Sequence, residues 1–326
     1  MKPKLQDVAK LANVSSTTVS RVINNYGHIS DKTRRRVHEA MEQLNYRPNS
    51  LARSLQGKSA HLIGLVFFDI SHPFFGELVS KLENLLFERG YKTILCNSAN
   101  NPDKEREYLK LLAANQVDGI IAGAHNTDIS EYREYDLPII SFDRYLSNKI
   151  PIVSSDNLAG GKLAGSTLYN AGVRKPLVLS GVLQENSPTN NRISGFKQIF
   201  EAHNITIKNF QVPFETLPSL KQERIYDILK NKEYDGVFCS DDLTAIQVCE
   251  AASQLHITIP KDLKVIGYDG TKLIQNYHPN LTTIVQPLGD ISQLLVELLL
   301  EKIATPEASM KSEYPLPVQL HIGKTV

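Results

Sequence analysis

A group of carboxylates in the second part of the chain recurs in one sequence position, directly after an apolar run. The members are Asp69, Asp143, Asp156, Asp241 and Asp269. A carboxylate can accept hydrogen bonds from two neighbouring hydroxyls, and a guanidinium such as that of Arg192 can donate a fork from the opposite side. The pattern indicates a site for a polyhydroxyl ligand such as a sugar, with Phe74, Phe75 or Phe214 against its apolar face. Each aspartate alone is equally well explained as a helix cap, so this interpretation depends on the five together.

The elements that must position these side chains follow from an alternation of apolar runs and amphipathic stretches. Nine runs predict strands at 61–68, 91–97, 119–124, 137–143, 151–156, 175–181, 204–213, 236–241 and 263–269. Six stretches between them predict helices at 75–89, 103–114, 157–171, 192–203, 218–231 and 243–255. This alternation is typical of an α/β fold with parallel sheets and helices on both faces. The carboxyl ends of parallel strands share one edge, so we expect the aspartates to meet at one crevice.

The length of this region fits two sheets, hence two lobes. The sequence break lies near Asp156-Asn157, and a return crossing is expected near Gln286-Pro287. We therefore expect a body at 60–326 with an amino-terminal lobe at about 60–156 and 287–304. The carboxy-terminal lobe is expected at about 157–286 and 305–326.

The first 46 residues predict a different unit, built from three short helices. Val8, Ala9 and Leu11 are spaced to bury one face of a first helix, Asn13 suits a left-handed turn, and Ser15 can cap a second helix. The second helix would bury its valines and leave Ser16, Thr17, Ser20 and Arg21 on its outer face. Two helices joined by such a turn are typical of a helix-turn-helix that reads the DNA major groove.

Charge is distributed unevenly along the chain. Residues 1–60 contain eleven Lys or Arg against four Asp or Glu, a net charge of +7, and the remaining 25 basic and 31 acidic residues give −6. A solvated three-helix bundle is the alternative interpretation of the basic head. The turn, the polar outer face and the charge together favour an end that contacts phosphate.

Residues 47–59 connect head and body, and two interpretations of them stay open. Pro48 suits the first turn of a helix, Leu51, Ala52 and Leu55 give it a short apolar side, and Gly57 can end it. The segment is too short to be a stable helix alone. It is either a hinge helix that folds on DNA and inserts a leucine into the minor groove, or an ordinary linker.

The stretches from Asp7 to Asn24, from Pro48 to Leu55 and at Ile63-Gly64 resemble the lactose/galactose repressor family of bacterial regulators. The resemblance implies a body like the periplasmic sugar-binding proteins, with a ligand between the lobes. It also implies that Ser16, Thr17 and Arg21 read the major groove and that Leu55 is the minor-groove wedge. The full DNA-contacting set that we expect is Ser16, Thr17, Ser20, Arg21, Asn24, Asn49, Ala52, Arg53 and Leu55. The ligand set implied is Asp69, Phe75, Asp143, Asp156, Arg192, Asp241 and Asp269.

Residues 137–144, 187–192 and 52–58 resemble more specifically the sucrose-operon repressors of Gram-positive bacteria. This implies a repressor of sucrose-utilisation genes whose effector is a small sugar or sugar phosphate. The alternative is a catabolite-control regulator of the same family, whose effector is a phosphorylated carrier protein bound to the outer face of the amino-terminal lobe. Two operator half-sites need two heads, so we expect a homodimer on double-stranded DNA.

Several functions are not supported by the sequence. Gly160-Gly161-Lys162 lacks the spacing of a phosphate loop, and no nucleophile set accompanies the aspartates, so neither a cofactor nor enzymatic activity is expected. Cys96, Cys239 and Cys249 have no paired spacing and are expected to be reduced core thiols in a cytoplasmic protein, without a metal site. No apolar run is long enough for a membrane span.

Overall fold

The computed structural model describes residues 3–23, 26–47, 59–124, 126, 129–182, 187–213 and 216–326. The chain forms two compact units, Met1–Ala60 and His61–Val326. The hinge residues Asn49, Ala52, Arg53 and Leu55, like Asn24 in the head, lie outside the described residues, so their expected roles stay predictions.

The head consists of α1 (Leu5–Leu11), α2 (Ser16–Ile23) and α3 (Asp31–Gln43) around a small apolar core that includes Val8, Val19 and Val37. Asn13 has a φ of 50°, which is the left-handed turn expected between α1 and α2. The hydroxyl of Ser15 accepts a hydrogen bond from the backbone N–H of Thr18 at 3.1 Å and so caps α2. The predicted helix-turn-helix geometry is confirmed.

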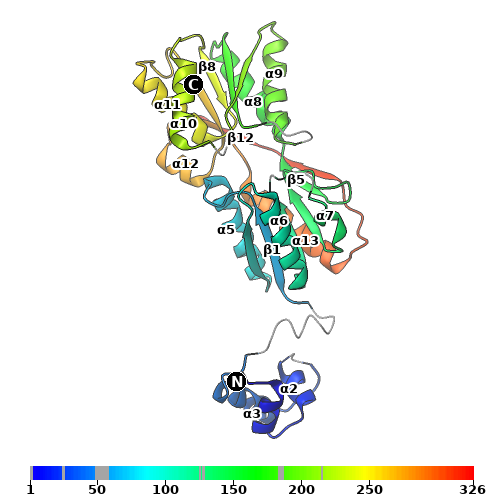
Figure 1. The fold of residues 1–326 in the computed structure, drawn as a ribbon. Helices are drawn as coiled ribbons and strands as arrows, with labels where there is room; N and C mark the ends of the chain where they lie inside the picture. Colours follow the sequence, from blue (N-terminus) through cyan, green and yellow to red (C-terminus); the bar gives the residue numbers. More distant parts are fainter. Residues whose placement is uncertain are drawn as a thin grey trace. The chain divides into compact units, whose positions relative to one another are not determined.

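The body is built on two six-stranded, mainly parallel sheets (Figure 1). The first has the strand order β11-β5-β4-β3-β1-β2. Its members are β1 (Leu62–Phe67), β2 (Lys92–Asn97), β3 (Gly119–Gly123), β4 (Ile139–Phe142), β5 (Ile152–Ser155) and β11 (Glu313–Leu316). The second has the order β12-β10-β9-β8-β6-β7. Its members are β6 (Pro176–Ser180), β7 (Lys208–Gln211), β8 (Gly236–Cys239), β9 (Lys264–Asp269), β10 (Thr282–Val285) and β12 (Gln319–His321).

Helices cover both faces of each sheet, as expected from the alternating sequence (Figure 1). In the first lobe, α5 (Pro73–Glu88) and α13 (Leu288–Ala304) pack on one face, and α6 (Pro102–Ala114) and α7 (Glu131–Glu134) on the other. In the second lobe, α8 (Asn157–Asn170) and α9 (Asn190–Glu201) cover one face. The other face is covered by α10 (Pro218–Leu229), α11 (Asp242–Gln254) and α12 (Lys272–Tyr277).

The boundary expected for the end of the chain is wrong. We assigned 305–326 to the carboxy-terminal lobe, but β11 pairs in parallel with β5, with Glu313 opposite Ile152, and belongs to the first sheet. The chain returns to the second sheet only at β12, which pairs antiparallel with β10. The lobes are therefore joined by crossings after β5, after β10 and between β11 and β12, which places three connecting segments beside the region between the lobes.

Close packing of α8 on α9 explains the glycines at positions 161 and 195. A Cβ placed on Gly161 would lie 1.9 Å from the carbonyl oxygen of Arg192, and one on Gly195 would lie 2.2 Å from that of Leu158. The glycines let the two helix backbones touch, and they thereby set the distance between the residues that α8 and α9 present at their first turns. In the part of the chain that the structure describes, no helix is long and apolar enough to cross a membrane.

Candidate functional site

A cavity lies between the two lobes of the body. Five of the predicted ligand residues line it: Phe75, Asp143, Arg192, Asp241 and Asp269. The first lobe also contributes Phe68, His72, Phe74, Gly123, Phe142 and Arg144, and the second lobe with its crossing segment contributes Thr189, Ser240 and Gln286. The strand ends of two separate sheets thus meet at one site, as the position of the aspartates predicted.

Two of the predicted residues, Asp69 and Asp156, are not among those that line the cavity. The Asp69 carboxylate accepts hydrogen bonds from the backbone N–H and the hydroxyl of Ser71, at 2.9 and 2.8 Å. Asp156 accepts from the backbone N–H of Ala159 at 2.9 Å and is the N-cap of α8. Both carboxylates organise the segment that follows their strand, which is the capping role that each aspartate had as its alternative, and their contact with a ligand stays a prediction.

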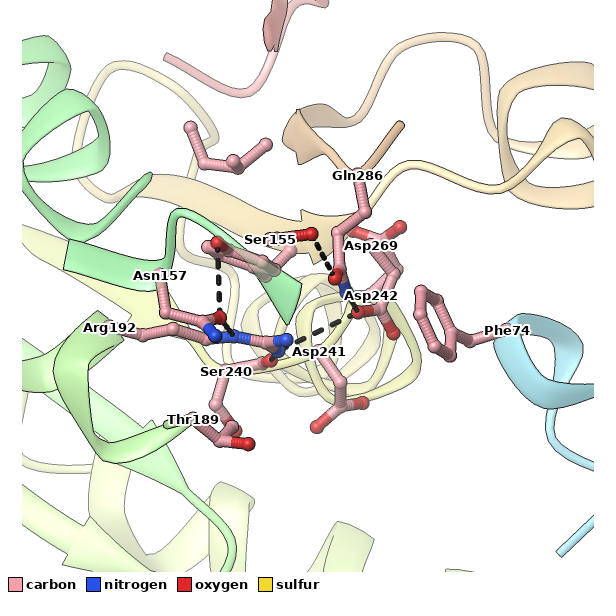
Figure 2. A network of polar contacts seen from close by, with 12 residues as sticks. Phe74, Ser155, Asn157, Thr189, Arg192, Ser240, Asp241, Asp242, Asp269 and Gln286 are labelled. Atoms are coloured by element: carbon pink, nitrogen blue, oxygen red, sulfur yellow. Dashed lines mark hydrogen bonds and ion pairs between the residues drawn. The ribbon is translucent and has the colours of Figure 1, made fainter. Parts of the chain in front are cut away.

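Arg192 is the centre of the polar wall (Figure 2). Its Nε donates to the side-chain oxygen of Asn157 at 2.7 Å, and one terminal nitrogen donates to the carbonyl oxygen of Ser240 at 2.9 Å. The guanidinium also lies 3.6 Å from a carboxylate oxygen of Asp269 and 3.9 Å from one of Asp143. Its flat face stacks on the ring of Tyr268, 3.8 Å from the centroid. These contacts fix the side chain in one orientation, with 7% of it exposed.

Asp143 joins the two lobes at this wall. It follows β4 in the first lobe, and its carboxylate accepts from Asn157 at 2.9 Å and from the hydroxyl of Thr189 at 3.0 Å. The neighbouring Arg144 donates to the hydroxyls of Ser187 and Thr189, at 2.6 and 3.0 Å. A change in the angle between the lobes must break or rearrange these bonds, so the site is sensitive to closure.

The three aspartates of the second lobe differ in their protonation. Burial alone raises the pKa of Asp241, but Lys221, His72 and hydrogen bonds from Thr244 offset it and hold that pKa below its usual value. Burial raises the pKa of Asp269 well above its usual value, opposed by Arg192. Burial also raises the pKa of Asp242, which lies behind the cavity wall, to about 7. The wall thus combines the firmly ionised carboxylate of Asp241 with that of Asp269, which holds a proton more readily, and Asp242 behind the wall does so too.

The wall formed by the first lobe is aromatic. Phe74 stacks on Phe142 with ring centroids 5.7 Å apart and meets Phe75 edge-on at 5.4 Å. Figure 2 shows Phe74 reaching the site from α5, on the side opposite Arg192. His72 caps α5 with its Nδ1, which accepts from the backbone N–H of Phe74 at 3.3 Å, and burial lowers the pKa of its imidazole. The imidazole is therefore held neutral, with its proton on Nε2.

Several residues of the site were missed by the sequence reasoning. Asn157 and Gln286 are the most consequential, because they hold Arg192 and Asp269, and Gln286 donates to Asp269 at 2.7 Å and accepts from Ser155. A signal existed for Gln286, since it follows the apolar end of β10 as the aspartates follow their strands, but β10 itself was not predicted. Thr189 is at the N-cap position of α9 and lies in the 187–192 stretch that resembles the sucrose-operon repressors, but it was not predicted as a site residue.

The head presents a second candidate surface. Thr17 and Arg21 are exposed one turn apart on α2, and Ser16 and Ser20 are half-buried on the same helix. The guanidinium of Arg36 donates to the carbonyl oxygen of Ala12 and so caps the end of α1, which was not expected from its place in a basic run. Thr17 and Arg21 are the best placed of the predicted groove-reading residues.

A helix-turn-helix head on a two-lobed body, with a cavity that has one polar and one aromatic wall, defines a ligand-responsive DNA-binding regulator. Residues 4–49 match the family model for bacterial regulatory proteins of the lacI family, and residues 166–326 match that for a periplasmic binding protein-like domain. The chain is 57% identical over 325 residues to the sucrose operon repressor of Pediococcus pentosaceus, with 100% of both chains covered. The chain belongs to the lacI family.

Solved structures agree with this assignment. The lac repressor dimer bound to operator and the anti-inducer ONPF is 25% identical, with a TM-score of 0.85 over 100% of this chain and 99% of that chain. A periplasmic binding protein/LacI transcriptional regulator from Alkaliphilus metalliredigens, complexed with D-xylulofuranose, is 30% identical. It matches with a TM-score of 0.74 over 81% of this chain and 98% of its own.

Proposed function

We propose that this chain is a transcriptional repressor whose affinity for operator DNA is changed by a small sugar bound between the lobes. The head contacts the major groove through Thr17, Arg21 and their neighbours, and two copies of the chain form a homodimer on a two-fold operator. The regulated genes are those of sucrose utilisation, as the names of its relatives suggest. Such a repressor acts in the bacterial cytoplasm and catalyses no reaction.

One observation carries the proposal: the cavity has an aromatic wall facing a wall of carboxylates, an amide and a guanidinium. A sugar ring has apolar C–H faces and a rim of hydroxyls, so it can pack against Phe74 and Phe75 while its hydroxyls reach Asp241, Asp269 and Arg192. The sugar complex of the Alkaliphilus relative supports this ligand class. We prefer a small effector to a carrier protein because these side chains meet inside a cavity and not on an outer surface.

The cavity also links ligand to DNA. Asp143 and Arg144 come from the first lobe and bind Thr189 of the second. A sugar that contacts both walls binds the closed arrangement of the lobes more tightly than an open one and shifts the population toward it. Three segments connect the two sheets, and β1 of the first lobe begins at Leu62, directly after the hinge segment 47–59 and its next two residues. We infer that a change in the angle between the lobes reaches the head through this connection.

The test is operator binding with and without sugar. A duplex selected by the purified protein from a randomised pool is labelled and titrated with protein by fluorescence anisotropy, alone and with millimolar sucrose, D-fructose, D-glucose or D-ribose. We expect at least one sugar to change the operator affinity tenfold or more. Selection of no duplex, or operator affinity that is the same with every sugar, would contradict the proposed function.

A further inference from the structure

The cations that line the cavity are already bound by protein groups. Arg192 contacts Asp143 and Asp269 and donates to Asn157 and to the Ser240 carbonyl oxygen. Arg144 donates to its neighbour's carbonyl oxygen and to two hydroxyls of the second lobe. Neither guanidinium can turn toward a new anion without giving up contacts that hold the lobes or the wall together.

Carboxylates outnumber these cations in the described lining. Asp143, Asp241 and Asp269 face two arginines. Asp241 is 4% exposed, and its two oxygens accept from the backbone N–H of Thr244 at 2.7 Å and from its hydroxyl at 2.6 Å. The buried ammonium of Lys221 also donates to that hydroxyl, at 2.6 Å, and is thereby held behind Asp241. The ionised carboxylate of Asp241 is thus a fixed negative charge in the wall.

The opposite wall adds no positive charge. Its members from the first lobe, apart from Asp143 and Arg144, are four phenylalanines, one glycine and His72, whose buried imidazole is neutral. The body residues outside the description, at 125, 127–128, 183–186 and 214–215, include no lysine or arginine.

We propose that the site accepts an unphosphorylated sugar and rejects the phosphorylated form of the same sugar. This specificity rests on the proposed function, namely that the cavity binds a sugar. A phosphate group carries up to two negative charges at neutral pH and needs donors or cations that are not already neutralised. Here it would meet either a phenylalanine surface, which cannot replace its water shell, or a wall in which the ionised carboxylate of Asp241 repels it. The hydroxyls of a neutral sugar, in contrast, can donate to Asp241 and Asp269.

Isothermal titration calorimetry on the full-length protein tests this specificity. The ligands are D-fructose, D-glucose and sucrose, each compared with its 6-phosphate, at constant ionic strength. We expect at least one neutral sugar to bind 100-fold or more tightly than its phosphate. A phosphorylated sugar that binds as tightly as its neutral form would overturn this specificity and leave the proposed function intact. Absence of binding by all six compounds would instead contradict the proposed function.

A charge-neutral variant separates charge from shape. Asp241→Asn keeps the size of the side chain and an oxygen that can accept from Thr244, but removes the fixed negative charge. We expect the preference for neutral sugar over its phosphate to fall at least tenfold. Asp227→Asn, which changes an exposed carboxylate on α10 of the same lobe that pairs with Lys230, should leave the preference unchanged. A preference that is equal in Asp241→Asn and the wild type would show that charge does not set the specificity.

Discussion

Replacing Arg192 by methionine removes the central cation of the cavity while keeping most of the apolar volume of the side chain. Two hydrogen bonds are lost, at 2.7 and 2.9 Å, along with contacts to two carboxylates at 3.6 and 3.9 Å. Removing one partner of a buried ion pair costs about 3–5 kcal/mol of stability. Asp143 keeps Asn157 and Thr189 as donors, and Asp269 keeps Gln286 and can take up a proton. We therefore expect a loss of about 3 kcal/mol, the lower end of that range.

Arg192→Met should also weaken sugar binding, because the guanidinium that donates hydrogen bonds to the sugar is lost. Hydrogen bonds to a charged group contribute about 1.5–3 kcal/mol each, and a guanidinium can offer a sugar two donors. Since about 1.4 kcal/mol corresponds to a factor of ten, Arg192→Met should bind sugar at least about 100-fold more weakly. Operator affinity without sugar should stay near the wild-type value wherever the body is folded, because the head is a separate compact unit.

Calorimetric titration of sugar and guanidinium-induced unfolding followed by circular dichroism measure the two effects. The matched control is Arg174→Met, since Arg174 also stacks on a tyrosine, with its guanidinium 4.4 Å from the Tyr169 centroid, but lies outside the cavity. Sugar affinity equal to wild type in Arg192→Met would refute the placement of the ligand. An unchanged unfolding transition would refute the argument from the buried carboxylates.

Three further changes test other parts of the molecule. Gly195→Ala should destabilise the body by about 1–3 kcal/mol or more and weaken sugar binding, because the new Cβ would lie 2.2 Å from the Leu158 carbonyl oxygen. Thermal unfolding measures this loss of stability. The control Gly289→Ala should show no such loss, because a Cβ at that position has nothing within 4 Å. With a pKa of about 7 when folded against 3.8 otherwise, Asp242 makes the folded body bind an extra proton between those pH values, so the free energy of unfolding should fall as pH rises from about 4 to 7. Asp242→Asn should flatten this slope, and a difference from wild type that does not vary with pH would contradict the assignment. Leu55→Ala in the predicted hinge should weaken operator binding and reduce DNA bending, and unchanged anisotropy and gel mobility would exclude the wedge.

The nine predicted apolar runs correspond to β1–β9, the edge strands β2 and β7 included, whereas β10 and β11 were not predicted. β11 contains Glu313 and Pro315 and has an alternately exposed pattern, so nothing local distinguishes it from a loop. Its place beside β5 is a consequence of the long connection from α13, which the sequence does not specify. This is why the end of the chain was assigned to the wrong lobe.

The candidate site shows the same limit at the level of single side chains. Asp69 and Asp156 follow strands just as Asp143 and Asp269 do, yet the first two cap the segments that follow and the last two face Arg192. Position after a strand predicts the edge of the sheet at which a side chain lies. Whether the carboxylate turns back to its own backbone or toward the other lobe depends on contacts with residues distant in the sequence, such as Thr189 of the second lobe.

The central claim is that one ligand in the cavity controls DNA binding by the head, and thermodynamic linkage tests it most directly. The affinity of the sugar is measured by calorimetry for the free protein and for the protein saturated with its selected operator duplex. The two sugar affinities must differ by the same factor by which the sugar changes operator affinity. We predict equal factors of tenfold or more. The same sugar affinity with and without operator would contradict the account.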